Sequence, residues 1–371
     1  MRIDRLTVEN FRSYEKESVV PDPEVTVFYG ENARGKTNLL EAVFLCCTAR
    51  SHRTARENEL VRFDCEKAEV GAGIRKLNGE TRIDLTIPQK GKKTAAIGGM
   101  KLDRIAELLG TLNGVLFSPE DLRLVKDGPE MRRRFMDISL SQVSPVYLHT
   151  LASYMRALKQ RNGLIRQIAL GQEKEALLSV WDEQLAKYGA DLIRRRIKWT
   201  DHLNETAGAI YADISSGRER FDIDYQCHFE ASDELEQVIY DFLNQKHEED
   251  LRRGTTLYGP HRDELMMKIN GFPMRAFASQ GQQRTGALSL KLAELRMMEE
   301  ATGDSPILLL DDVMSELDSE RQKMLIRHTG GVQTLIACTD ADLLPSFAGR
   351  SCAIYRIGMQ NGISHAEKQT L

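Results

Sequence analysis

The sequence predicts an α/β fold that is interrupted by a long helical insertion. Strands buried on both faces of a sheet are continuous apolar runs, and such runs occur towards both ends of the chain, at 25–29, 307–310, 334–337 and 353–357. Between them, residues 145–217 are almost continuously helical in pattern. We therefore expect both ends of the chain to build one α/β layer structure and the middle to form a separate subdomain.

Length and composition limit the class of protein. A chain of 371 residues exceeds the usual size of one core, so two domains or one large insertion are expected. With 41% hydrophobic and 29% charged residues the chain resembles an ordinary soluble protein. It has neither a bilayer-spanning apolar run nor a signal-peptide core, which predicts a cytoplasmic protein without a membrane partner. The six cysteines lack C-x-x-C spacing, so neither a metal site nor a disulfide framework is expected.

Two Asn-Gly pairs predict β-hairpins, at Asn78-Gly79 and Asn270-Gly271. In the helical insertion, apolar residues spaced three and four apart predict a short coiled coil whose helices reverse direction near Gly171. A projecting arm and a plain packed helical subdomain both fit this pattern. The residues of the heptad seam are Leu178, Trp181, Leu185, Tyr188 and Leu192.

Residues 30–37 read GENARGKT, which satisfies the phosphate-binding pattern G-x-x-x-x-G-K-[ST] between a predicted strand and a predicted helix. Glycines in such a loop let backbone N–H groups close around phosphate oxygens at a helix N-terminus. Lys36 is expected to pair with the β- and γ-phosphates of ATP, and the Thr37 hydroxyl to bind Mg²⁺.

A phosphate-binding loop requires a carboxylate for the metal, and Asp311 and Asp312 follow the buried run 307–310. Asp311 is the expected partner of Mg²⁺. Asp312 is placed to orient and deprotonate the attacking water. The alternative interpretation is that both aspartates only cap the following helix.

The segment FASQGQQRTG, residues 277–286, has no apolar period and precedes a helix predicted over 287–298. Gln282, Gln283 and Arg284 are expected to face outward. A helix N-terminus presents N–H donors and the positive end of the dipole. The segment is therefore expected to meet an anion, although a simple turn capped by Ser279 fits as well.

Taken together, GENARGKT, SQGQQ, the strand ending in Asp-Asp and the SELD sequence after it resemble the Walker A, signature, Walker B and D-loop motifs of ABC-type ATPase heads, and the inserted arm resembles the SMC branch. The ordered set FRSY, GENARGKTNLLEA, FSPEDL, RRRFMD, YGPHRDEL, SQGQQR and DDVMSELD resembles the RecF family of bacterial recombination mediators. The nucleotide-binding residues that this resemblance implies are Gly30, Glu31, Asn32, Ala33, Arg34, Gly35, Lys36, Thr37 and Asn38, with Ser279, Gly281 and Gln282 acting on the ATP of the opposite protomer.

The resemblance implies a weak, Mg²⁺-dependent and DNA-dependent ATPase that forms a homodimer on ATP. It also implies binding to gapped DNA at single-strand/double-strand junctions and action with RecR and RecO in loading RecA, at the nucleoid in the cytoplasm. The implied domains are residues 1–118 and 257–371, which form the ABC-type P-loop ATPase head, and 119–256, the inserted helical arm subdomain.

Three departures from ABC transporters limit which residue roles can be transferred from those proteins to this sequence. The second Walker B acid is Asp312 rather than glutamate, and the switch position offers Thr339 and Asp340 rather than histidine. FSPEDL contains no glutamine, so Glu120 and Asp121 are only candidates for the Q-loop position.

Basic clusters occur at 132–134, at 194–196 with Lys198, and at Lys90, Lys92 and Lys93. Each is interpreted as a phosphate contact or as an ordinary solvated surface. His261 and Arg262 are expected to be structural or near the nucleotide. A small-molecule kinase and an ABC transporter subunit share part of the motif set and stay as alternatives to a DNA-repair ATPase.

Overall fold

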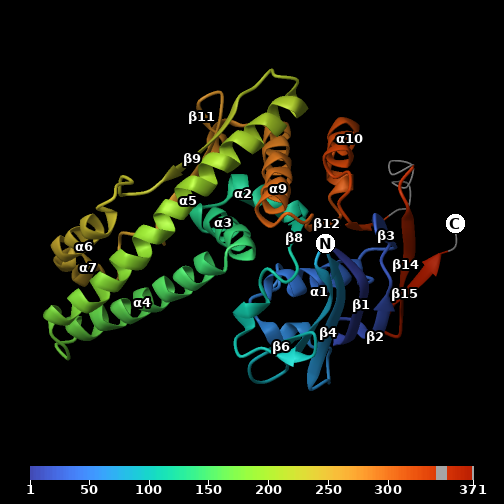
Figure 1. Cartoon of the computed structure of the whole chain (residues 1–371), viewed down its shortest axis with the longest axis horizontal. Coiled ribbons are helices and arrows are strands. Elements are labelled where there is room, and N and C mark those ends of the chain that lie inside the picture. Colours follow the sequence, from blue (N-terminus) through green and yellow to red (C-terminus); the bar gives the residue numbers. More distant parts are fainter. Residues whose placement is uncertain (340–348, 370–371) are drawn as a thin grey trace. The chain divides into compact units, whose positions relative to one another are not determined.

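The computed structural model describes residues 1–339 and 349–369 and divides into two compact units (Figure 1). The first unit comprises Met1–Leu122, Ala209–Arg218 and Ser279–Leu371, and the second comprises Arg123–Gly208 and Glu219–Ala278. The predicted boundary at 118 lies close to the transition at 122, whereas the predicted boundary at 256 lies 22 residues before the transition at 278, and residues 209–218 of the predicted insertion belong to the first unit. Within the described residues, no helix is both long enough and apolar enough to cross a membrane.

A six-stranded sheet forms the centre of the first unit, in the order β15-β14-β3-β13-β12-β8. All neighbours pair in parallel except β14 and β15, which confirms the predicted parallel strands. The strands are β3 Val25–Tyr29, β8 Gly114–Phe117, β12 Ile307–Asp311, β13 Thr334–Cys338, β14 Cys352–Gln360 and β15 Ile363–Gln369. The carboxyl ends of β3, β12 and β13 lie along one edge, where ligands of open α/β sheets bind.

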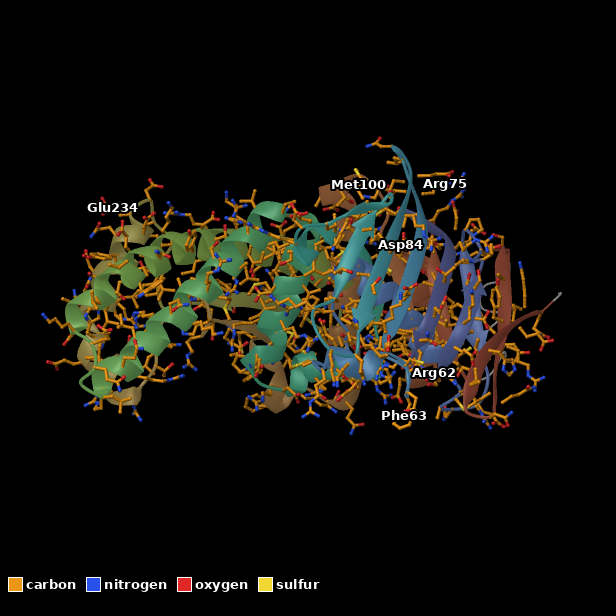
Figure 2. The ribbon with its side chains drawn as sticks, turned by 90° about the horizontal axis from the view of Figure 1, so that it is seen from below. Arg62, Phe63, Arg75, Asp84, Met100 and Glu234 are labelled. Carbon is orange, nitrogen blue, oxygen red and sulfur yellow. The ribbon has the colours of Figure 1, made fainter. Side chains whose placement is uncertain are left out.

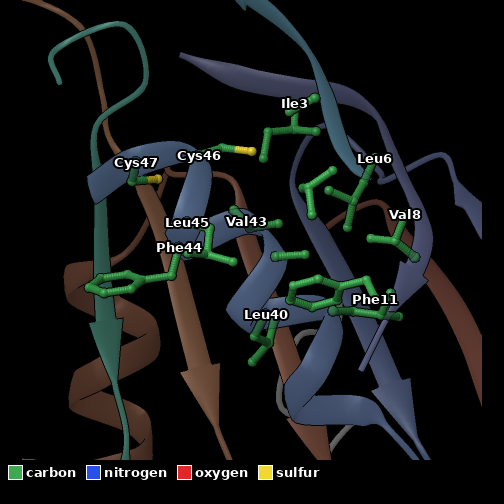
Figure 3. Close-up of a cluster of buried hydrophobic side chains, with 14 of the residues drawn as sticks. Ile3, Leu6, Val8, Phe11, Leu40, Val43, Phe44, Leu45, Cys46 and Cys47 are labelled. Atoms are coloured by element: carbon green, nitrogen blue, oxygen red, sulfur yellow. The ribbon is translucent and has the colours of Figure 1, made fainter. Parts of the chain in front are cut away.

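A second sheet of the first unit is antiparallel, in the order β2-β1-β4-β5-β6-β7. Its buried face packs on helix α1, with Ile3, Leu6 and Phe11 lying close to Leu40 and Val43 (Figure 3). The hairpin predicted at Asn78-Gly79 is present as β4–β5. The strands are β1 Arg2–Phe11, β2 Tyr14–Val19, β4 Lys67–Lys76, β5 Gly79–Pro88, β6 Thr94–Ile97 and β7 Met100–Lys101. The helices of this unit are α1 Lys36–Thr48, α9 Gln280–Thr302 and α10 Ser319–His328.

The second unit is mainly helical and contains the sheet β11-β10-β9. Its helices are α2 Arg123–Lys126, α3 Pro129–Val143, α4 Pro145–Ala169, α5 Leu178–Ser215, α6 Leu235–Gln245, α7 His247–Arg253 and α8 Met274–Phe277, and α5 ends within the first unit. Its strands are β9 Phe221–Gln226, β10 Glu264–Ile269 and β11 Phe272–Pro273. The second predicted hairpin is β10–β11, although the prediction extended the returning strand into residues that form α8.

Helices α4 and α5 run antiparallel, because Thr150 bonds Asp191 and Arg161 bonds Asp182 (Figure 1). The reversal follows α4 at Gly171, whose φ of 71° is in the left-handed region that glycine adopts without strain. The heptad seam is partly confirmed. Its leucines are buried, and Trp181 and Tyr188 are half-buried.

Six cysteines lie among the described residues; Cys46, Cys47 and Cys338 are buried, and the other three are half-buried.

Candidate nucleotide-binding site

The loop between β3 and α1 lies at the carboxyl edge of the central sheet. Gly35 is the N-cap of α1 with a φ of 109°, and no side chain of the described residues caps this helix. In the first turn of α1 the Asn38 N–H donates to the Gly35 carbonyl at 3.1 Å, whereas the N–H groups before it have no acceptor within the helix and can donate to water or a ligand. An anion such as a phosphate fits this position, because the helix dipole also favours negative charge there.

Two glycines of the loop are required by close packing. A Cβ at Gly30 would lie 2.5 Å from the Ile357 carbonyl oxygen, and one at Gly35 would lie 2.6 Å from the Ser364 hydroxyl. Both contacts are shorter than van der Waals approach permits, and both glycines have positive φ angles. Strands β14 and β15 therefore set the shape of the loop.

Lys36 is buried at 4% exposure, and its ammonium donates to the Gly30 carbonyl at 2.7 Å and to the Glu31 carbonyl at 3.0 Å. No carboxylate among the described residues forms an ion pair with it. Because a buried ammonium without a countercharge is costly, a bound phosphate would supply the charge that this position lacks.

The Thr37 hydroxyl donates to Oδ1 of Asp311 at 2.7 Å, which joins the loop to the end of β12. Burial raises the pKa of the Asp311 carboxyl, Asp312 raises it further, and the Thr37 hydrogen bond lowers it in part. A hydroxyl and a carboxylate at this separation are hard oxygen ligands of the kind Mg²⁺ prefers. These two residues therefore fit a magnesium ion, which would supply positive charge beside the phosphates.

Asp312 is held differently from its neighbour. Its φ of 52° is left-handed, its N–H donates to the Ala337 carbonyl at 3.0 Å, and its carbonyl accepts from Ser315 at 2.8 Å. Burial raises the pKa of its carboxyl, and Lys36 partly offsets this. The left-handed backbone turns Asp312 away from the direction of β12, so the two aspartates have different environments and can have different roles.

The remaining predicted loop residues are more exposed. Glu31 and Arg34 form an ion pair at 2.6 Å, and Ala33 has a φ of 61°. Asn32 is exposed. Asn38 lies in the first turn of α1, where its amide donates to Ser13 at 2.8 Å.

Three residues that support the loop were missed by the sequence reasoning. The Ser364 hydroxyl donates to the Arg34 carbonyl at 2.6 Å and also bonds Ser13, and Tyr14 donates to the Gly35 carbonyl at 3.2 Å. Ser13 and Tyr14 belong to the FRSY motif, which was recognised without a role. Ser364 carries no local signal, because only the pairing of β15 brings it to the loop.

A cavity of about 760 Å³ adjoins the loop, and Arg12, Ser13, Asn38 and Arg53 are among its lining residues. Glu41, fully buried, accepts two hydrogen bonds from Arg12 and one from Ser51.

Burial raises the pKa of the Glu41 carboxyl, but the hydrogen bonds outweigh burial and leave this pKa lowered. Arg12 in the cavity wall is thus held in place by the charged Glu41 carboxylate behind it. At the rim, Phe63 is 86% exposed and projects outward near Arg62 (Figure 2).

The segment 277–286 forms a helix start rather than a loop. Helix α9 begins at Gln280, not at 287 as predicted, and Ser279 is its N-cap. The Ser279 hydroxyl accepts from the Gln282 N–H, and the Gln282 side chain accepts from the Ser279 N–H. This capping box leaves Ser279 exposed at the N-terminus of α9.

The first turn of α9 is linked to the D-loop region. Arg321 of α10 donates to the Gly281 carbonyl at 3.1 Å and to Thr285 at 2.9 Å, and Arg284 pairs with Glu316 at 2.8 Å. Gln282, Gln283 and Arg284, expected to face outward, are each half-buried. The signature segment and the D-loop therefore form one connected surface of the first unit.

Several other candidates have structural roles. Asp121 accepts from the Ser118 N–H at 2.7 Å within its own turn, whereas Glu120 is exposed. His261 bonds Tyr154 at 2.7 Å in the second unit, which confirms its structural alternative. Thr339 follows β13 as expected, and Asp340 lies outside the described residues.

Two arginines of the basic clusters are buried, so neither interpretation, a phosphate contact or a solvated surface, is correct for them. Arg132 makes two hydrogen bonds of 2.6 Å to Glu264. Arg196, 2% exposed, bonds Tyr147, Asp137 and a backbone carbonyl. Sequence clustering failed here because adjacent helical residues point in different directions.

Comparisons with known proteins identify the family. The family model described as "RecF/RecN/SMC N terminal domain" matches residues 2–364. The "DNA replication and repair protein RecF" of Lachnoclostridium phytofermentans is 41% identical over 357 residues, which cover 96% of this chain and 98% of that relative. The chain belongs to the RecF family.

Solved structures agree with the RecF assignment. One described as "Structure of the recombination mediator protein RecF-ATP in RecFOR pathway" has a TM-score of 0.91 and 35% identity, covering 99% of this chain and 97% of that one. An SMC head bound to the C-winged helix domain of ScpA has a TM-score of 0.59 at 16% identity, covering 100% of this chain and 98% of that one, and this shows fold alone. The fold of this RecF-family chain is therefore the SMC/ABC-type ATPase head.

Proposed function

We propose that this chain is an ATP-dependent, DNA-binding recombination mediator that dimerises on ATP, binds gapped DNA and helps load RecA during repair and replication restart. The observation that carries the proposal is the Thr37–Asp311 contact, which brings a hydroxyl and a carboxylate suited to Mg²⁺ beside the phosphate-binding loop of a RecF-family head. The names of the relatives support the repair role, since one is called a DNA replication and repair protein and another a recombination mediator with ATP.

We assign each site residue a role within this proposal. Backbone N–H groups of the 30–35 loop and the start of α1 bind phosphate oxygens, and Lys36 turns from the loop carbonyls to the β- and γ-phosphates. Thr37 and Asp311 would hold Mg²⁺, which would supply charge stabilisation to the transferred phosphoryl group. Asp312 orients the attacking water and accepts its proton. Its carboxylate is one methylene shorter than that of glutamate, which favours slow hydrolysis.

The signature segment acts in trans in this proposal. The Ser279 hydroxyl accepts a hydrogen bond within the capping box, so its own proton stays able to donate to a γ-phosphate of the opposite protomer. The Gly281 backbone and the Gln282 side chain lie in the same first turn of α9. Association of two copies would then depend on the γ-phosphate, and hydrolysis would release it.

The proposed domain division is an ATPase head from residues 1–118 and 257–371 with an inserted helical subdomain at 119–256. The proposed partners are DNA, a second copy of the chain, RecR, and RecO and RecA in the same pathway. The relevant observation is that the described neighbour belongs to the RecFOR pathway. A nucleoid location would follow from DNA binding.

The test is ATP hydrolysis by the purified chain with Mg²⁺, alone and with gapped DNA, with blunt duplex of equal length as the control. We expect slow basal hydrolysis that gapped DNA stimulates more than blunt duplex. A hydrolysis rate that neither DNA changes, together with no measurable DNA binding at low salt, would contradict the proposed function.

A further inference from the structure

Helix α4 has an unusual charge pattern. Its 25 residues, Pro145–Ala169, contain no aspartate or glutamate, whereas four arginines and lysines and one histidine are present. One arginine, Arg161, is fully buried and bonds Asp182 and Asp250. The positive charge that remains must therefore lie on the solvent face of the helix.

The solvent face of α4 carries that charge in one stripe. His149, Arg156, Lys159 and Arg166 are exposed. At 3.6 residues per turn, the three arginine and lysine positions fall within about 80° around the helix axis. Among the described residues, no ion pair includes Arg156, Lys159 or Arg166, so their charge is not neutralised by the protein. We call these three residues the α4 stripe.

The antiparallel neighbour of α4 provides the contrast. Charged positions on the exposed side of α5 carry both signs, and Asp191 and Arg195 form an i,i+4 pair at 2.9 Å. The outer charged residues of α5 are Glu183, Lys187, Asp191, Arg195, Lys198, Asp201 and Glu205. This is the pattern of an ordinary solvated helix. The α4 stripe is therefore not a general property of the second unit.

The basic clusters that the sequence emphasised are largely occupied. Arg132 and Arg196 are buried and paired. Arg133 donates to the Asp263 carbonyl at 2.7 Å, and Arg194 donates to the Ser232 and Asp233 carbonyls at 3.2 and 3.1 Å. Within the second unit, the α4 stripe is better placed than these clusters to bind an external anion.

We propose that the α4 stripe binds the phosphate backbone of DNA without reading its sequence, an inference that rests on the proposed function. Arg156 and Arg166 are about 15 Å apart along the helix at 1.5 Å per residue. Duplex DNA presents one phosphate per roughly 1.7 Å of its axis, so about nine phosphates lie along that length. Long cationic side chains on a rigid helix can meet several of them at once.

The test compares two variants of equal charge change. Lys159→Glu with Arg166→Glu alters the α4 stripe, and Lys187→Glu with Lys198→Glu alters exposed lysines of α5. DNA affinity is measured from 50 to 300 mM salt for both variants and the unaltered chain. Each lost phosphate contact reduces the salt slope by about 0.9.

We expect the α4 variant to lose about 1.8 from its slope and on the order of 10-fold in affinity at low salt. The α5 variant should retain the slope of the unaltered chain. ATP affinity and the thermal midpoint should be unchanged in both. If charge reversal lowers the midpoint, Lys159→Gln with Arg166→Gln against Lys187→Gln with Lys198→Gln repeats the comparison.

Equal losses of DNA affinity and salt slope in both variants would overturn the proposal, since they would show only the effect of net charge. An unchanged salt slope of DNA affinity in the α4 variant would also overturn the proposal. If that variant instead lost binding to an acidic partner protein, the stripe would be assigned to a protein interface. Failure of the unaltered chain to bind any DNA is a different result, which would contradict the proposed function itself.

Discussion

The Thr37 hydroxyl donates to Asp311 across 2.7 Å, although 274 positions separate the two residues in the chain. The contact unites the phosphate-binding loop after β3 with the carboxylate at the end of β12. In the sheet, β13 lies between these two strands. The parallel order of the three strands therefore brings together the residues proposed to bind Mg²⁺ and phosphate, and the following predictions test that proposal.

Lys36→Ala is expected to lower ATP affinity about 100-fold, because charge-assisted hydrogen bonds contribute roughly 1.5–3 kcal/mol each. Calorimetric titration with ATP measures this, and the thermal midpoint checks that the fold is intact. Lys36→Arg should retain binding but hydrolyse poorly, since a planar guanidinium does not reproduce ammonium geometry. Normal ATP affinity in Lys36→Ala would contradict the assignment of the loop.

Asp312→Asn is expected to bind ATP normally and to slow hydrolysis by about 10²–10⁴-fold, because the general base is lost. Asparagine tolerates the left-handed backbone at this position, so the substitution preserves the local geometry. The dimer formed on ATP should accumulate. Asp311→Asn is the control, and it is expected to lower the affinity for Mg²⁺ instead. The reverse pattern would exchange the roles of the two aspartates.

Ser279→Arg is expected to leave ATP binding to the monomer intact and to abolish dimerisation on ATP and hydrolysis. The substitution also removes an N-cap, at a cost of about 1 kcal/mol. Ser279→Asp, which keeps a capping oxygen but adds negative charge next to a γ-phosphate, should behave like Ser279→Arg in dimerisation. Sedimentation in the presence of ATP, compared with ADP, measures dimerisation. A Ser279→Arg protein that dimerises on ATP would exclude the trans role.

His261 and Asp263 predict opposite pH dependences. Burial lowers the pKa of His261 to about 4 and raises the pKa of Asp263 to about 6. Between pH 4 and 6.5 the unfolded state binds more protons at His261 than the folded state does. The contribution of His261 to the free energy of unfolding therefore increases with pH and falls on acidification. At Asp263 the folded state binds more protons, so stability falls as pH rises from 4 to 6.

The two effects therefore nearly cancel in the unaltered chain, each amounting to roughly 3 kcal/mol at about 1.4 kcal/mol per pKa unit. Asp263→Asn should reveal the His261 effect as an unfolding free energy that increases from pH 4 to 6.5. Urea denaturation across this range measures it. Adding His261→Gln should flatten the curve again, and a flat curve in Asp263→Asn alone would contradict the prediction.

Local patterns were enough for the elements and motifs of the head. Continuous apolar runs predicted β3, β12, β13 and β14, and Asn-Gly pairs predicted two hairpins, since these signals depend on neighbouring residues. Lys36, Thr37 and Asp311 were placed correctly relative to strand ends because parallel strands end along one edge. The start of α9 was misplaced, since the glutamines and glycine before 287 hid a helical turn that Ser279 caps.

Tertiary structure alone decided which polar residues reach the phosphate-binding loop or the solvent. Ser364 reaches the loop because β15 pairs with β14, 330 positions from the Arg34 carbonyl that it bonds. Arg132 and Arg196 read as surface charges but are buried against Glu264 and Asp137. Burial depends on which distant segments pack together, and periodicity in one helix does not encode that packing. The exposed, unpaired α4 stripe became visible only once those partners were known.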